Sequence, residues 1–210
     1  MSIQILAIEN KPISSISYII YIEKKDSCII IDPGSENPEE IDRVIIDKNL
    51  KPQYIIFTHE HFDHIWSANY FICKYRVSII CSEYCFKAIQ DPKLNLSLFY
   101  DTNKAFSINP LKQKIIKEEE IINWEDKKLL IKETKGHSLG GIIISMENYI
   151  FTGDTLIKNI KTVTKLKGAS KEKLHEFIEY LKSLIGLNYI IYPGHGDYFC
   201  LDNYDLSLAL

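Results

Sequence analysis

The chain has 210 residues, of which 46% are hydrophobic and 25% charged, and its formal net charge is −3. These proportions are those of a globular protein and exclude a disordered, fibrous or coiled-coil chain. Because 25 basic residues stand against 28 acidic ones, no overall positive field is available to bind a nucleic-acid backbone. We therefore expect the protein to act on a small-molecule substrate and not to bind nucleic acid. The length predicts a single domain over residues 1–210.

The N-terminal segment and the cysteines bear on the compartment. The segment lacks the basic residues with which a secretory signal begins. The longest apolar runs, such as residues 16–22, are shorter than the roughly 18 residues that a membrane span requires. We expect a cytoplasmic protein that does not bind membranes. Five scattered cysteines favour reduced thiols over a disulfide framework, and Cys81 and Cys85 lack the second ligand pair that a shared metal ion would need.

The first part of the chain alternates short β-branched segments with helical patterns. Asn37 and Pro38, followed by two acidic residues, are typical of a helix start. The predicted strands are residues 3–8, 16–22, 28–32, 54–57 and 77–81. The predicted helices are residues 37–49, 65–75 and 82–90.

The second part begins with a long connection, residues 91–110, of a length typical of functional covers. One further helix is predicted from about residue 170, with Leu174, Phe177, Ile178, Leu181, Leu184 and Ile185 on its buried face. The remaining predicted strands are residues 113–117, 128–134, 142–146, 149–152 and 189–192. Because helices do not separate the strands one by one, this order favours an α/β protein with two mixed sheets, a four-layer αββα sandwich, over a doubly wound parallel sheet.

The segment Thr58-His-Glu-His-Phe-Asp-His64 carries the strongest chemical signal. It places three imidazoles and the Asp63 carboxylate within six residues, directly after a buried strand. Imidazole nitrogen and carboxylate oxygen are preferred ligands of zinc and similar ions. His59 and His61 can share one ion, which leaves Asp63 and His64 to face a second.

Three later turns each contain a potential ligand beside glycine. Glycine allows the close backbone approach that a ligand-bearing turn needs. Each turn alone is a weak signal, since such turns are common, but together they complete two coordination shells. The turns are Gly136-His137-Ser138, Gly153-Asp154-Thr155 and Gly194-His195-Gly196.

These motifs resemble the metallo-β-lactamase superfamily, in particular its glyoxalase II-like hydrolases (hydroxyacylglutathione hydrolases). The resemblance rests on Ile31-Asp-Pro-Gly34, Thr58 to His64, Thr134-Lys-Gly-His-Ser138, Phe151-Thr-Gly-Asp-Thr-Leu156 and Tyr192-Pro-Gly-His-Gly196. It implies one ion held by His59, His61 and His137. It implies a second held by Asp63, His64 and His195, with Asp154 bridging the two. Asp32 would orient a ligand from outside, and the αββα sandwich is also the fold of that family.

Two ions of this kind imply hydrolytic chemistry. A hydroxide held between them would attack an acyl carbonyl, while one ion polarises the carbonyl oxygen. Asp63 would be a ligand, orient the nucleophile and receive its proton. We expect hydrolysis of a thioester or a similar activated ester or lactone, with zinc as the metal and iron or manganese as alternatives.

Two departures from glyoxalase II concern substrate recognition. Glyoxalase II carries a C-terminal helical domain that holds glutathione, and with only 15 residues after His195 we expect no such domain here. The usual Gly-Arg segment after the bridging aspartate is replaced by residues 156–167. There Lys158, Lys161, Lys165 and Lys167 favour a solvated charged loop over a site for an anionic substrate. Recognition would then depend on residues 91–110 and 155–168, or on a partner.

The ligand set leaves other functions open. A mononuclear iron oxidoreductase of the persulfide dioxygenase kind would need only His59, His61 and either Asp154 or His137. A metallonuclease would use the same ligands, although no basic surface for a nucleic acid is visible. A metal-binding protein without activity is the third alternative. The sixth histidine, His175, follows Leu174 among glutamates on the last predicted helix and is expected at the surface.

Overall fold

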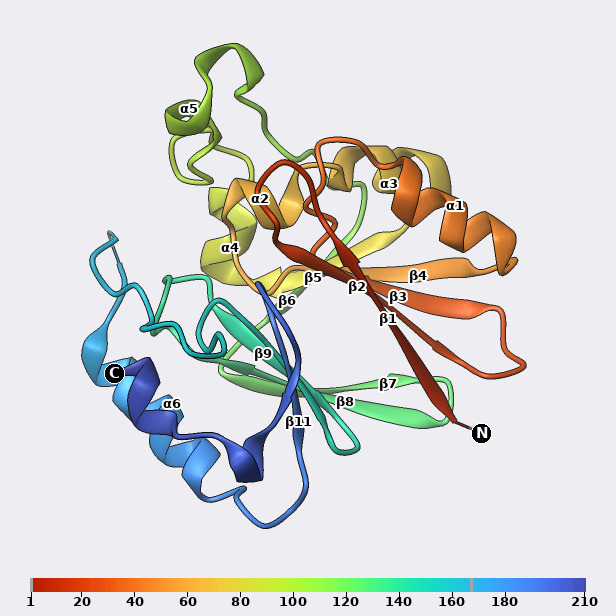
Figure 1. Ribbon diagram of the computed structural model, residues 1–210. Helices are drawn as coiled ribbons and strands as arrows, with labels where there is room; N and C mark the ends of the chain where they lie inside the picture. The colour runs from red at the N-terminus through yellow and green to blue at the C-terminus, as the bar shows by residue number, and fades with distance from the viewer. Residues whose placement is uncertain (1, 167) are drawn as a thin grey trace.

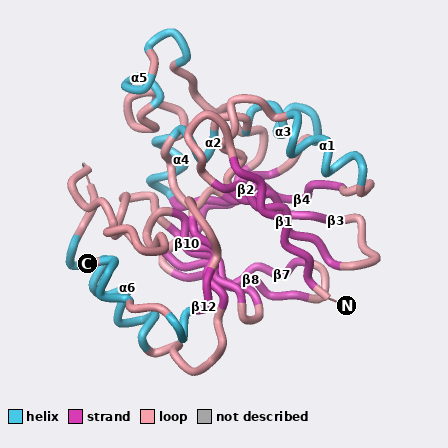
Figure 2. Tube along the Cα trace, in the orientation of Figure 1, coloured by secondary structure: helices cyan, strands magenta, loops and turns pink. Residues whose placement is uncertain are grey.

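The computed structural model describes residues 2–166 and 168–210, which form two six-stranded sheets packed face to face. Helices cover the outer face of each sheet, as Figure 1 and Figure 2 show. The predicted four-layer αββα sandwich is therefore confirmed.

The first sheet has the order β1-β2-β3-β4-β5-β6. Its first three strands pair antiparallel, and β3 to β6 pair parallel to one another. Parallel neighbours bring the carboxyl ends of β3 and β4 to the same edge of the sheet. The strands are β1 (Ile3–Glu9), β2 (Ile16–Ile22), β3 (Ser27–Ile31), β4 (Lys51–Ile56), β5 (Ser78–Ser82) and β6 (Gln113–Ile116).

The second sheet has the order β12-β11-β10-β9-β8-β7. Its strands pair antiparallel except for β10 and β11, which are parallel, so their carboxyl ends also lie at one edge. The strands are β7 (Glu119–Trp124), β8 (Lys127–Glu133), β9 (Ile142–Met146), β10 (Tyr149–Gly153), β11 (Ile190–Pro193) and β12 (Phe199–Cys200).

The helices are short and belong to one sheet or the other. α1 (Glu39–Asp47), α2 (Phe62–Ile65), α3 (Ala68–Tyr75) and α4 (Glu83–Ala88) lie on the side of the first sheet. α6 (Lys171–Lys182) lies on the second sheet with the 3-10 turns η2 (Leu201–Asn203) and η3 (Leu206–Ala209). The connection 91–110 holds α5 (Ser97–Tyr100) and the 3-10 turn η1 (Thr102–Lys104).

Isoleucine makes most of the central core. Alternate residues of the first sheet point to opposite faces, so that Ile20 and Ile29 pack between the sheets while Ile19 and Ile30 pack under the helices. The core between the sheets also holds the fully buried Trp124, whose indole nitrogen donates to Ser27 Oγ at 2.8 Å. Strands buried on both faces explain why these segments are almost continuously apolar.

The structure differs from the predicted elements at several points. The strand β7 was not predicted. It is an edge strand that buries Ile122 and Trp124, but the apolar Ile121 is 60% exposed, so apolar and polar residues do not alternate along its sequence. The predicted helix 65–75 is two helices, because Ser67 turns the chain by donating from its amide and its hydroxyl to the Pro33 carbonyl. Ile185 is exposed, since α6 already ends at Lys182.

The N-terminal ends of α6 and α1 are capped differently. Ser170 caps α6 by accepting from the Lys173 amide. At α1 the residue before the helix is Pro38, while the Asn37 side chain accepts from the Glu39 amide. None of the described helices is both long and apolar enough to cross a membrane.

Candidate metal centre

Loops at the carboxyl ends of five strands meet at one end of the sandwich and carry all the predicted ligands. Asp32 follows β3, and the segment His59 to His64 follows β4. In the second sheet, His137 follows β8, Asp154 follows β10 and His195 follows β11. The parallel pairs β3/β4 and β10/β11 explain why residues so distant in sequence converge.

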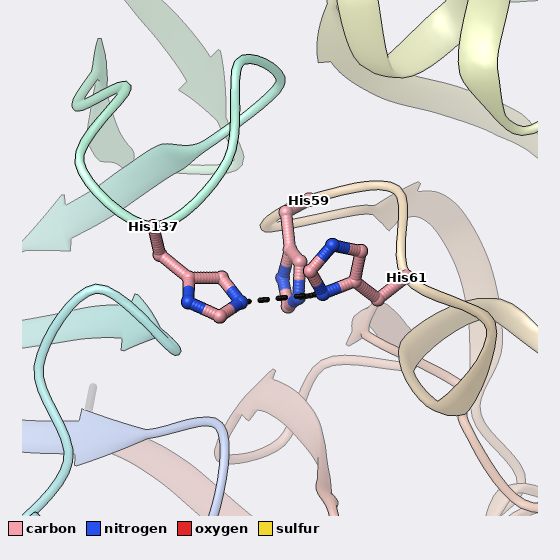
Figure 3. A group of neighbouring side chains, drawn as sticks. All are labelled: His59, His61 and His137. Carbon is pink, nitrogen blue, oxygen red and sulfur yellow. Dashed lines mark hydrogen bonds between the residues drawn. The ribbon is translucent and has the colours of Figure 1, made fainter. Parts of the chain in front are cut away.

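The first group contains His59, His61 and His137, which point toward one another in Figure 3. His61 Nδ1 lies 3.1 Å from His59 Nε2 and 3.2 Å from His137 Nε2. Nitrogens bound about 2.0 Å from a tetrahedral zinc ion lie about 3.3 Å apart, so the observed spacing is that of ligands around one ion. All three imidazoles are buried.

The second group contains Asp63, His64 and His195. Asp63 Oδ2 lies 3.3 Å from His195 Nε2 and 3.6 Å from His64 Nε2. His64 is completely buried, whereas His195 is partly exposed, so this group opens to solvent on the His195 side.

Asp154 lies between the two groups. Its Oδ1 is 3.4 Å from His64 Nε2, and its Oδ2 is 3.6 Å from His195 Nε2 in the second group. The same Oδ2 is 3.8 Å from His137 Nε2 in the first group. One carboxylate is thus within reach of both sets of imidazoles, which is the position predicted for a bridging ligand.

Four of the five imidazoles have an acceptor on their outer nitrogen, Nδ1. His137 donates to the Val163 carbonyl and His195 to the Ser14 carbonyl, each at 3.1 Å. His64 donates to Asp32 at 3.0 Å, and His59 lies 3.1 Å from Thr58 Oγ1. Because a carbonyl or carboxylate only accepts, Nδ1 carries a proton in these contacts, and Nε2 is the nitrogen that faces the cluster.

Asp32 lies behind the cluster rather than in it. It is almost fully buried and accepts three hydrogen bonds, from His64 Nδ1, from the Thr58 amide at 2.7 Å and from the Thr58 hydroxyl. Burial raises the pKa of Asp32, and these hydrogen bonds oppose that rise. Although Asp32, His59 and His64 also have ligand atoms close together, the carboxylate oxygens already have partners and orient the histidines.

The electrostatics separate the two groups. Burial lowers the pKa of His61 to about 4 and lowers the pKa values of His59 and His137, so these imidazoles are neutral at pH 7. Burial acts in the same direction on His64, but the Asp154 and Asp63 carboxylates outweigh it and raise the pKa of His64. In return, the imidazoles hold the pKa of Asp154 below its usual range against the effect of burial.

Glycine is required where the backbone approaches the ligands. A β-carbon at Gly194 would lie 2.8 Å from His64 Cε1 and in direct collision with Asp154 Oδ1. At Gly34 a β-carbon would overlap the Asp63 carbonyl oxygen. The glycines of the sequence motifs therefore leave the space that the ligand side chains occupy.

The residues present fit a metal centre. His64 Nε2 and Asp154 Oδ1 are buried, yet neither has a hydrogen-bond partner within the described part of the chain. A buried imidazole nitrogen and a buried carboxylate oxygen left without partners are costly unless a cation binds them. Imidazoles and carboxylates grouped in this way are the donor set of zinc, iron or manganese, and a charged histidine releases its second proton when it binds such an ion.

Several contacts at the site leave no signal in the sequence. The Val163 and Ser14 groups that hold His137 and His195 are backbone carbonyls, which any residue could supply. Glu60, inside the histidine motif, turns away from the cluster: it accepts from Ser138 Oγ at 3.1 Å, and burial raises its pKa to about 7. It joins two ligand-bearing loops.

The other residues considered in the sequence lie outside the cluster. His175 is exposed on α6, as predicted. Lys158, Lys161 and Lys165 are exposed and form no ion pair with any described residue, which agrees with a solvated loop, whereas Lys167 lies outside the described residues. The five cysteines are free.

Comparisons with known proteins agree with the fold and the cluster. A probable metallo-hydrolase of Methanocaldococcus jannaschii is 32% identical over 92% of this chain and 93% of its own. A hydroxyacylglutathione hydrolase of Buchnera aphidicola is also 32% identical, but the match covers 62% of this chain and 43% of that protein. Among solved structures, the BLEG-1 B3 metallo-β-lactamase superposes with a TM-score of 0.86 at 23% identity, covering 94% of both chains.

The family model described as the metallo-β-lactamase superfamily matches residues 14–195, a range that contains every predicted ligand. Together with the relative that matches along nearly its whole length, this shows that the chain belongs to the metallo-β-lactamase superfamily.

Proposed function

We propose that the protein is a metal-dependent hydrolase that uses two divalent ions to cleave a thioester or a similar activated ester of a small molecule. The observation that carries this proposal is the position of Asp154, whose two oxygens face imidazoles of both groups at 3.4 to 3.8 Å. A centre for one ion would need only one of the two groups.

In this proposal each group would hold one ion, and Asp154 would be a ligand shared by both. His59, His61 and His137 would hold the first ion, and Asp63, His64 and His195 would hold the second. Ions held there would lower the pKa of a bound water and polarise an acyl carbonyl, which is the chemistry that ester hydrolysis requires at neutral pH.

The side chains of the protein orient the reactants and move the proton. Burial disfavours the charge of Asp63, but His64 and His195 outweigh it and lower its pKa, so the carboxylate is ionised at pH 7. It accepts a hydrogen bond from the attacking water, and takes up its proton as the carbonyl is attacked. Asp32 keeps the His64 ring in one orientation and acts through it.

Zinc is the proposed metal, because imidazole and carboxylate donors in a closely spaced set are its usual ligands. The name of the relative in Buchnera aphidicola supports a thioester substrate, although that match covers less than half of that protein. Glutathione itself is not proposed as the carrier, since the equivalent of the usual Gly-Arg segment is a lysine-containing loop here.

Elemental analysis of the purified protein combined with a panel of thioesters, lactones, β-lactams and phosphodiesters tests the proposal. Two equivalents of zinc and turnover of thioesters are expected. The His175→Ala variant, which removes the exposed histidine, serves as the control and should keep both ions and activity.

Other outcomes would identify other functions. One equivalent of iron per chain with oxygen consumption on a persulfide would replace the hydrolase proposal with an oxidoreductase. Cleavage of RNA at low protein concentration, with the thioesters left intact, would replace it with a nuclease.

A further inference from the structure

Two loops beside the candidate metal centre expose large apolar side chains. We call Leu94, Phe99 and Tyr100 the upper rim, and Ile160, Val163 and Leu166 the lower rim. Phe99 is 73% exposed and Val163 is 48% exposed. In Figure 1 the loop of α5 and the loop that leads into α6 project from the same side of the sandwich. Grouped apolar side chains beside a candidate site, unlike scattered ones, indicate a binding surface.

The lower rim is attached to the metal centre at both ends. Its loop starts at Thr155, the residue after Asp154, and the Val163 carbonyl accepts from His137 Nδ1 at 3.1 Å. Thr162 Oγ1 donates back to the Thr155 carbonyl at 3.0 Å, which closes the loop on itself. The Val163 backbone therefore contacts a predicted ligand of the first ion.

Contacts from the C-terminal segment brace the same loop from outside. The Asn159 amide donates to Tyr204 Oη at 2.9 Å, and the Thr162 amide donates to the Ala209 carbonyl at 3.0 Å. Ala209 is completely buried. The backbone on either side of Ile160 is thus attached to the C-terminal segment, and Ile160 and Val163 remain about half exposed.

The upper rim is attached to the other side of the first group. Phe62, between His61 and Asp63, stacks on Tyr100 with ring centroids 4.8 Å apart. The Phe62 amide also donates to the Asn95 carbonyl at 2.8 Å, which fixes the connection to the start of α2. His61 and His137 are 3.2 Å apart, so the two rims flank the first group of histidines.

Resting on the hydrolase function proposed above, we propose that the substrate carries an apolar acyl chain, which lies between the upper and lower rims while its carbonyl faces the histidines. The rims reach the same three imidazoles from both sides, through Phe62 and through Val163, so a chain attached to the reacting carbonyl leaves the centre along them. A small hydroxyacyl group would leave both rims uncovered.

Chain length is the direct test. With one common thiol, kcat/KM of the metal-loaded protein is measured for acetyl, butanoyl and octanoyl thioesters. A half-covered methylene contributes about a two-fold change, so the six methylenes that separate acetyl from octanoyl should give about a 60-fold difference. Val163→Ser and Phe99→Ser should lower the octanoyl-to-acetyl ratio. Ile46→Ser is the matched control, because Ile46 is 59% exposed on α1, and it should leave the ratio unchanged.

Binding gives a second readout that does not require turnover. Trp66 contacts both Tyr100 and Phe106, with centroids 5.5 and 6.0 Å apart, so its fluorescence reports on the upper rim. Titration with acetate, octanoate and dodecanoate should show binding that tightens with chain length. Phe99→Ser and Val163→Ser should weaken octanoate binding about five-fold, and Ile46→Ser should not.

The outcomes separate the two proposals. Alkanoate binding that depends on length and on the rims, without hydrolysis of any thioester, would overturn the hydrolase and support the apolar site. Hydrolysis that is equally fast for all chain lengths, with no preference in binding, would overturn the apolar site alone. The protein could instead self-associate through the rims, in which case Phe99→Ser would abolish the association and dodecanoate would not compete with it. That result would assign the rims to a second copy of the chain and overturn the inference.

Discussion

His64 Nδ1 donates a hydrogen bond to Asp32 Oδ2 at 3.0 Å, and neither side chain has more than 2% of its surface exposed. The contact joins β3 to the histidine segment after β4. Since Nδ1 carries the proton, Nε2 is left free to face Asp63 and Asp154. A residue outside the cluster thus decides which nitrogen of His64 is available as a ligand.

We predict that Asp32→Asn weakens binding of the second ion about 10- to 100-fold while the first ion is retained. An amide in this place can present its NH2 group to His64 and so favour the wrong tautomer. Competition titration with a chromophoric chelator measures both affinities. Asp42→Asn, a change at another buried aspartate that lies on α1, should leave both unaltered. Equal loss of both ions in Asp32→Asn would contradict the role assigned to Asp32.

Asp154→Ala should remove both ions and abolish hydrolysis together, because one carboxylate faces both groups of imidazoles. Asp63→Ala is the informative comparison, since Asp63 approaches only His64 and His195 among the predicted imidazole ligands. It should lose one ion and keep the other. The metal content of the two variants is read by elemental analysis, and a variant at Asp154 that retains two ions would refute the bridging position.

The layers of the fold were predictable because the strands are dense in isoleucine. Segments such as Ile16–Ile22 are buried along almost their whole length, so they are predicted as strands whichever face of the sheet is assumed to be buried. The edge strand β7 escaped prediction because it begins with two glutamates and exposes Ile121, which hides the alternation of Ile122 and Trp124. Edge strands have one neighbour and a looser pattern than central strands.

The convergence of the ligands was predictable from chemistry, and their orientation was not. Three histidines and an aspartate in one short segment already indicate a metal site, and the structure brings His137, Asp154 and His195 to it. The acceptors on His137 and His195 are carbonyls of Val163 and Ser14, which carry no side-chain signature. The rims likewise depend on where residues 91–110 and 155–166 fold, which local patterns do not determine.

Acid should remove the stabilising contribution of Asp42. This carboxylate accepts from Tyr70 Oη at 2.8 Å and from Lys74 Nζ and Tyr75 Oη, each at 2.6 Å. Burial disfavours its charge, but these donors outweigh that effect and hold the pKa of Asp42 below its usual range. A lowered carboxyl pKa stabilises the folded state above the unfolded pKa of about 3.9, and the contribution is lost as the pH falls through the folded value.

Asp42→Asn should therefore lower the free energy of unfolding by about 1 to 2 kcal/mol at pH 7. The difference from the unsubstituted protein should narrow between about pH 4 and pH 3. Urea unfolding with a chelator present measures this without a contribution from metal release. Asp47→Asn is the matched control, because Asp47 is exposed on α1 and has no ion pair within the described residues. A difference that stays constant from pH 7 to pH 3 would exclude ionisation of Asp42 as its source.

A single methyl group at Gly194 should disable the centre. An added β-carbon would collide with Asp154 Oδ1 and lie 2.8 Å from His64 Cε1 and 3.0 Å from the Gly153 carbonyl carbon, so the bridging carboxylate has to move. We expect Gly194→Ala to bind both ions at least about ten-fold more weakly and to lose about 1 to 3 kcal/mol of stability through overpacking. Gly196→Ala separates the causes: its φ of +74° makes alanine strained, yet no heavy atom lies within 4 Å of the added carbon. It should cost about 1 kcal/mol of stability and leave metal affinity intact. Equal loss of metal in both variants, followed by chelator competition, would mean that backbone strain rather than contact with Asp154 and His64 controls the site.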